Sequence, residues 1–226
     1  MKISDWPLAE RPRERLLAVG APALSDAELL AVFLRTGLKG QSAVDLARTL
    51  LKTHGSLSSL FSADFQTSKK MAGVGLAKWA SLQAALELAR RAGKERMKEG
   101  PLMNHPESVE SYLRQWLRFR PFEVFVGLFL DSAHRLIECE ELFRGTINQT
   151  AVYPREVIRR CLDLNAGAVI FAHNHPSGVA EPSRSDEVLT ANLRRSLASI
   201  GVEMLDHLII AGSECTSLAR RGEFAI

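Results

Sequence analysis

Residues 172–186 read Ala-His-Asn-His-Pro-Ser-Gly-Val-Ala-Glu-Pro-Ser-Arg-Ser-Asp, with two histidines separated by one residue and an aspartate eleven residues beyond the second. The preceding residues 166–172 form a short apolar run that contains the β-branched pair Val169 and Ile170, which predicts a buried strand. Because alternate residues of a strand share a face, His173 and His175 should project to the same side at its carboxyl end.

A turn and a helix are predicted to follow this strand. Pro176 and Gly178 end the strand and turn the chain. Ser183 then precedes an apolar stripe that predicts a helix over residues 184–200. Asp186 falls in the first turn of this helix, where the helix dipole favours a carboxylate. The strand end and the helix start would therefore bring two imidazoles and one carboxylate together.

Two imidazoles and a carboxylate form a ligand set that suits zinc. Three protein ligands, His173, His175 and Asp186, would leave the fourth tetrahedral position to water, as in catalytic zinc sites. A water in that position has a lowered pKa and acts as a nucleophile at neutral pH. We therefore expect one Zn²⁺ per chain. The alternative is a pair of surface histidines on a turn, followed by an acidic residue that caps a helix.

The complete spacing is more specific than His-x-His alone. His-x-His, seven residues, serine, two residues and aspartate is the signature of the JAMM (MPN+) metalloproteases, and His173, His175, Ser183 and Asp186 match it without an insertion. Together with the flanking Asn-Ala-Gly-Ala-Val-Ile-Phe-Ala and Pro-Ser-Gly, the stretch resembles the bacterial RadC family, which carries the name of a DNA-repair protein. The resemblance extends over nearly the whole chain, since segments 13–17, 23–30 and 33–37 are similar to the RadC amino-terminal region.

The expected fold is α+β, with two domains. In the first third, short helical segments are joined by glycine turns, which predicts an all-helical domain over residues 1–100. The charged run 90–101 is interrupted by Gly and Pro, which indicates a linker and sets the boundary near residue 100. For residues 101–226 the resemblance implies an α/β JAMM/MPN domain, cytidine-deaminase-like in fold, with a mixed sheet. Strand patterns at 123–130, 135–142 and 204–210, and helical patterns at 107–119 and 154–164, agree with it.

The resemblance also implies roles for two further residues. JAMM enzymes use a glutamate at the start of the first domain strand as general base, and the matching residue is Glu123, although the glycine after it lies one position later than usual. Ser183 would steady the developing oxyanion, or it could simply cap the helix, since its spacing from Asp186 is that of a capping box. Asn174 replaces the usual Ser or Thr between the histidines and should face away from the metal. His207 is interpreted as a core or structural polar contact.

A second motif lies in the amino-terminal domain. Residues 71–78 read Met-Ala-Gly-Val-Gly-Leu-Ala-Lys before a strong helical pattern, similar to a helix-hairpin-helix motif within residues 64–92. Its backbone turn could hold a phosphate of DNA through Gly73, Val74, Gly75 and Lys78. The alternative is a plain helical hairpin in which the glycines only make the turn.

Bulk composition sets the remaining limits. Residues 1–104 carry 16 Lys and Arg against 10 Asp and Glu, while residues 105–226 carry 13 against 16, so only the first part suits a polyanion partner. The three cysteines are far apart and fit reduced thiols of a cytoplasmic protein. No apolar run is long enough for a membrane span, and the amino terminus shows no signal peptide.

Three functional hypotheses remain at this stage. The first is a zinc metallopeptidase or isopeptidase linked to DNA metabolism, acting on an unknown peptide or protein substrate. The second is a DNA-binding repair or recombination factor in which the metal site is not catalytic. The third is a metal-dependent nuclease, although one mononuclear site suits phosphodiester cleavage less well than a metal pair. A base deaminase is rejected, because the Pro-Cys-x-x-Cys part of its zinc signature is missing.

Overall fold

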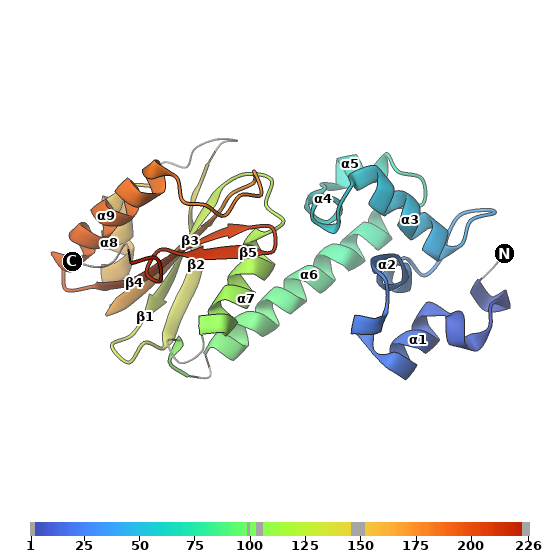
Figure 1. Cartoon of the computed structure of the whole chain (residues 1–226), viewed down its shortest axis with the longest axis horizontal. Coiled ribbons are helices and arrows are strands. Elements are labelled where there is room, and N and C mark those ends of the chain that lie inside the picture. The colour runs from blue at the N-terminus through green and yellow to red at the C-terminus, as the bar shows by residue number, and fades with distance from the viewer. Residues whose placement is uncertain (1–2, 99, 103–105, 146–151, 223–226) are drawn as a thin grey trace. The chain divides into compact units, whose positions relative to one another are not determined.

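The computed structural model describes residues 3–98, 100–102, 106–145 and 152–222 (Figure 1). The chain divides into two compact units, Met1–Leu88 and Ala89–Ile226. The division lies inside α6 (Leu76–Met97) and not near residue 100, because the charged segment expected to be a linker is helical. Met97 is buried in the core of the second unit, and Lys94 pairs there with Glu138. Among the described residues, no helix is both long and apolar enough to cross a bilayer.

The first unit is all-helical, as predicted. Its elements are three 3-10 turns (Ile3–Asp5, Leu8–Glu10 and Ala21–Ala23), α1 (Pro12–Val19), α2 (Asp26–Leu34), α3 (Ala43–His54), α4 (Leu57–Ser62), α5 (Phe65–Lys69) and the start of α6. A capping box of Ser25 and Glu28 begins α2. A small core forms where the apolar faces of α2 and α3 meet Val74 and Leu82.

The second unit is built on a five-stranded mixed sheet. Its elements are the end of α6, α7 (Pro106–Leu117), β1 (Val124–Leu130), β2 (Leu136–Arg144), α8 (Pro154–Asp163), β3 (Ala168–Asn174), α9 (Arg184–Ala198), β4 (Glu203–Ala211) and β5 (Glu214–Ser217). The strand order is β2-β1-β3-β4-β5, and only the β3–β4 pair is parallel. The predicted α+β class and mixed sheet are therefore confirmed.

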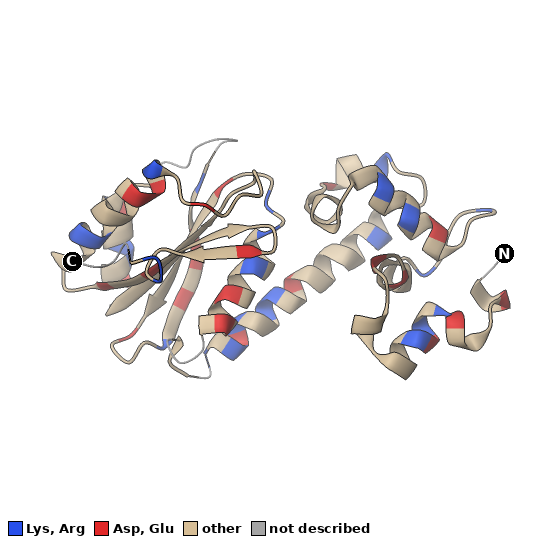
Figure 2. Ribbon diagram, in the orientation of Figure 1, with Lys and Arg blue, Asp and Glu red and all other residues tan. Residues whose placement is uncertain are grey.

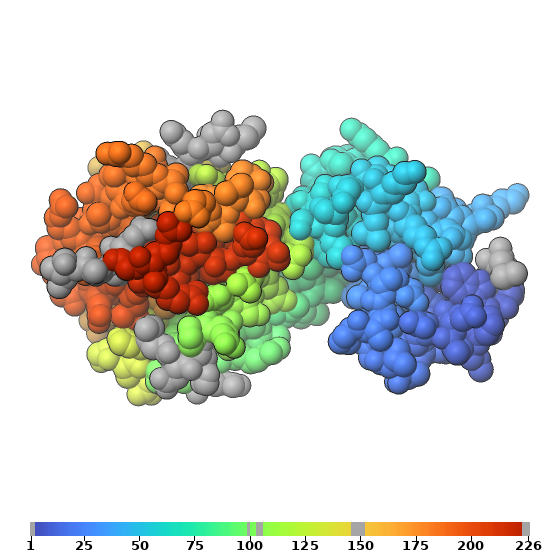
Figure 3. Space-filling model, viewed as in Figure 1, coloured from blue at the N-terminus to red at the C-terminus, as the bar shows by residue number. Residues whose placement is uncertain are grey.

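Helices cover both faces of this sheet (Figure 1). Even-numbered residues of β1 and β3 pack with α7 and the end of α6, whereas the odd-numbered residues pack with α8 and α9. This alternation explains why β1 and β3 are apolar along their whole length. After β5 the chain lies against α7 (Figure 3). Arg220 in this segment pairs with Glu110 of α7. His173, an odd-numbered residue of β3, lies on the face that α8 and α9 cover.

Candidate metal centre

The carboxyl end of β3 presents His173 on the α9 face. His173 is 5% exposed, and its ring stacks on that of Phe125 with an interplanar angle of 18°. His175 follows the strand, and its backbone N–H donates to the Ile210 carbonyl of β4. Its Nδ1 lies 2.8 Å from the Val179 carbonyl, which can only accept, so Nδ1 carries a proton. Nε2 of His175 is thereby directed toward the rest of the cluster.

Asp186 comes from the first turn of α9, as predicted. Ser183 and Asp186 form a capping box, in which the Ser183 N–H and hydroxyl donate to Oδ2 of Asp186 at 2.7 and 2.6 Å. The other carboxylate oxygen, Oδ1, faces His173 Nε2 at 3.1 Å. Burial alone would raise the pKa of Asp186, but hydrogen bonds to His173 and His175 hold that pKa far below its usual range.

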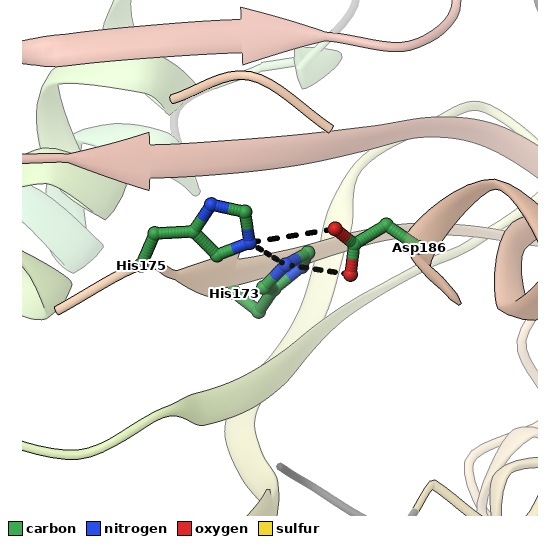
Figure 4. A group of neighbouring side chains, drawn as sticks. All are labelled: His173, His175 and Asp186. Carbon is green, nitrogen blue, oxygen red and sulfur yellow. Dashed lines mark hydrogen bonds and ion pairs between the residues drawn. The ribbon is translucent and has the colours of Figure 1, made fainter. Parts of the chain in front are cut away.

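The three side chains converge on a single point (Figure 4). The Nε2 atoms of His173 and His175 are 3.0 Å apart, and they lie 3.1 and 3.4 Å from the two oxygens of Asp186. Zinc–nitrogen bonds of about 2.0–2.1 Å at tetrahedral angles place two donor atoms roughly 3.3 Å apart. The donor types and their spacing therefore fit a zinc ion. The predicted ligands are brought together, and the side chains of His175 and Asp186 are each partly exposed.

The charges of this cluster affect one another. The hydrogen bond with Asp186 raises the pKa of His175, against the opposing effect of burial, and Glu123 adds to the rise. By contrast, complete burial lowers the pKa of His207 well below its ordinary value. The group thus combines an acid that stays ionised with imidazoles in two different environments.

Glu123 lies immediately before β1 and is half-buried. Phe125 pairs with His173 in the antiparallel β1–β3 ladder. The alternation of the strand places Glu123 on the same face as Phe125, at the position that faces His175. Its electrostatic effect on His175 agrees with this placement. Its role as a general base stays a prediction.

The structure places His207 next to the cluster. His207 is completely buried, as the core interpretation requires, but its ring also contacts His173 at 2.9 Å. No local sequence pattern locates this contact, because it depends on the register of β3 and β4, in which His207 pairs with Phe171, two residues before His173 on the same face of β3. Thr190 of α9, which contacts His207 from the other side, was missed because a threonine inside a helix carries no distinctive pattern.

In the helix-hairpin-helix motif, Gly73, Val74 and Gly75 lie between α5 and α6, and Lys78 lies near the start of α6. Gly73 has a φ of +86°, and a Cβ there would meet the Leu46 side chain at 2.9 Å, so backbone conformation and packing both favour glycine at this position. Val74 is buried in the core of the first unit. Gly75 has open space around it, whereas Lys78 is half-buried and donates to the Thr36 carbonyl at 2.7 Å.

Burial lowers the pKa of Lys78, and its ammonium is held by the protein backbone. Lys and Arg positions of the first unit are spread over α1, α3 and α6 with acidic positions among them (Figure 2). DNA contact through this unit therefore stays a prediction.

Comparison with known proteins agrees with both units. Residues 103–223 match a RadC-like JAB domain, and residues 3–80 match the UPF0758 N-terminal domain. A UPF0758 protein of Nitrosomonas eutropha is 59% identical over 222 residues, which cover 98% of this chain and 99% of the relative. UPF0758 proteins of Nitrosomonas europaea and Halorhodospira halophila are 57% and 55% identical, with the same coverage. The chain therefore belongs to the RadC family, with a UPF0758 N-terminal domain in front of a RadC-like JAB domain.

Proposed function

We propose that the second unit is a zinc-dependent hydrolase that cleaves an amide bond in a peptide or an isopeptide conjugate. The observation that carries this proposal is the convergence of the His173, His175 and Asp186 donor atoms at separations of 3.0–3.4 Å. Membership of a family with a JAB domain supports the same assignment. The names of the relatives describe no activity.

Each residue has a role that follows from its contacts. The two Nε2 atoms and the Asp186 carboxylate would hold the ion, and the Ser183 N–H and hydroxyl fix the orientation of that carboxylate through Oδ2. A zinc ion bound there supplies a Lewis acid that lowers the pKa of water and makes it nucleophilic at neutral pH. The Glu123 carboxylate would accept a proton from the attacking water and return it to the leaving amine. The Ser183 hydroxyl gives its proton to Asp186, so its first role is to orient a ligand, and oxyanion stabilisation remains an additional prediction.

The test is to measure zinc content and amide hydrolysis together. Protein prepared with excess zinc should hold one ion per chain, and His173→Ala should hold none. Glu123→Gln should retain the ion but lose about 10²–10⁴-fold in hydrolysis of quenched fluorescent peptides and isopeptide-linked substrates.

Glu141→Gln provides the matched control, because Glu141 pairs with Arg144 on β2 and should not affect the reaction. Well-folded wild-type protein that takes up no zinc under these conditions would overturn the proposal.

A further inference from the structure

His207 belongs to a chain of contacts behind His173. Its ring is completely buried, and its Nε2 lies 2.9 Å from Nδ1 of His173. On the other side, Nδ1 of His207 lies 2.6 Å from the hydroxyl oxygen of Thr190. That hydroxyl donates to the Asp186 carbonyl at 2.7 Å. The contacts therefore begin at one proposed ligand and end on the backbone of another.

The direction of these hydrogen bonds follows from the backbone carbonyl of Asp186, not from its side-chain carboxylate. A carbonyl oxygen can only accept, and two oxygens 2.7 Å apart repel each other unless a proton lies between them. The Thr190 hydroxyl has one proton, so this contact uses it. Toward His207 the Thr190 oxygen can then act only as an acceptor, which requires a proton on Nδ1 of His207.

The same reasoning continues through the two rings. A second proton on His207 would place a charge in a position without exposed surface, which is costly, so His207 is neutral and its Nε2 is an acceptor. His173 must then donate from Nδ1, so whenever this ring is neutral its Nε2 carries the lone pair. This is the nitrogen that faces Asp186 and His175.

The surroundings hold His207 in this position. Its backbone is fixed by the parallel β3–β4 ladder, and Phe125 packs against its ring edge-on at 5.4 Å. The neighbouring Asp206 carboxylate accepts from the Ser217 hydroxyl and the Ala219 N–H.

We propose that Thr190 and His207 are positioning residues that set the tautomer of His173, so that the neutral ring presents an unprotonated Nε2 to a metal ion. The inference rests on the proposed zinc site, and it adds a role for two residues that do not bind the ion themselves. Replacing a residue that hydrogen-bonds to a metal ligand typically weakens metal binding by about 10–100-fold.

The tautomer can be observed directly by NMR of protein labelled with ¹⁵N in histidine, with and without zinc. The signal that disappears in His207→Gln identifies His207. We expect this ring to carry its proton on Nδ1 and a bare Nε2 in both samples. A proton on Nε2 of His207 would overturn the inference, whatever the zinc affinity proves to be.

Zinc affinity, measured by competition with a chromophoric chelator, tests the consequence. Thr190→Val keeps the shape of the side chain but removes the acceptor, and it should weaken zinc binding by about 10–100-fold. Thr190→Ser keeps the hydroxyl and should bind zinc as wild type does. Ser196→Ala is the matched control, since Ser196 makes the same type of bond to a carbonyl of α9 without contacting a histidine.

The two proposals fail in different ways. Wild-type protein that binds no zinc would refute the proposed function, whereas the NMR measurement would still decide the tautomer. Zinc binding that is equally strong in wild type, Thr190→Val and Thr190→Ser would refute the positioning role and leave the hydrolase proposal standing.

Discussion

The side-chain oxygen of Asn174 accepts a hydrogen bond from the Val124 N–H at 2.8 Å. The amide nitrogen of the same side chain donates to the Phe122 carbonyl at 3.0 Å. These two backbone groups flank Glu123 on either side, so one side chain on β3 fixes the peptide groups around the proposed base. Asn174 can do this because it faces away from His173 and His175, as the alternation of β3 predicts. A serine or threonine there would be too short to bind both groups.

Replacing Asn174 should therefore weaken the start of β1 without affecting the metal ligands. In Asn174→Ala the buried Val124 N–H loses its partner, which should lower the free energy of unfolding by about 1–3 kcal/mol. Urea unfolding measures this loss, and hydrogen exchange at the Val124 amide should accelerate. Zinc content should stay at that of wild type.

The exposed Asn192 of α9 offers a control for this substitution. Asn192→Ala should change stability by no more than about 0.5 kcal/mol. If Asn174→Ala is as stable as that control, the contact with Val124 does not hold the strand start.

The buried thiols should be unreactive in the folded protein. Burial raises the pKa of Cys139 to about 12 and that of Cys161 to about 11. At pH 8 only about one Cys139 side chain in ten thousand is then in the thiolate form. Alkylation should therefore be slow and should accelerate as the pH rises. Mass spectrometry after iodoacetamide treatment should find both residues unmodified until urea unfolds the protein. Rapid labelling of native Cys139 would contradict its burial in the sheet core.

The convergence of His173, His175 and Asp186 was predictable because its determinants are local. A strand end fixes the relation of His173 to His175, and the Ser183–Asp186 capping box fixes where α9 begins. Both features depend on residues only a few positions apart.

The parts that were not predicted depend on contacts between distant residues. The charged segment before residue 100 is helical because Lys94 and Met97 find partners on α7 and the sheet. The contact of His207 with His173 depends on the register of two parallel strands, and the binding of Asn174 to Val124 joins residues 50 positions apart. Sequence periodicity predicts elements, but it carries no information on register between them.

Gly73 and Gly75 should differ in their effect on stability. Gly73→Ala forces a side chain onto a backbone with φ +86° and into contact with Leu46, which should lower the stability of the first unit by about 1–3 kcal/mol. Gly75→Ala meets no atom within 4 Å and should be close to neutral. Thermal unfolding compares the two variants. Equal destabilisation by both would mean that the turn around Gly73 is not packed as the structure has it.

The open surroundings of Gly75 also allow a clean test of DNA contact. If the turn holds a phosphate, Gly75→Asp should weaken binding to duplex DNA and reduce its dependence on salt. Ala9→Asp adds the same charge at another exposed position of the first unit and serves as the control. Lys78→Glu is less informative, because it also breaks the bond to Thr36. Identical DNA affinity of Gly75→Asp and Ala9→Asp would count against the helix-hairpin-helix interpretation.

Zinc should stabilise the second unit through Asp186. An ion that binds only the folded state adds about 2.7 kcal/mol at a concentration 100 times its Kd, so the melting temperature of wild type should rise with zinc and fall again with a chelator. Asp186→Asn keeps an oxygen that can accept from Ser183 and so should preserve the start of α9, but it removes the negative charge that attracts the cation. Its melting temperature should no longer respond to zinc. Glu187→Gln, one residue further along α9 and exposed, should respond as wild type does. An equal response in all three proteins would place the ion somewhere other than between the two histidines and this carboxylate.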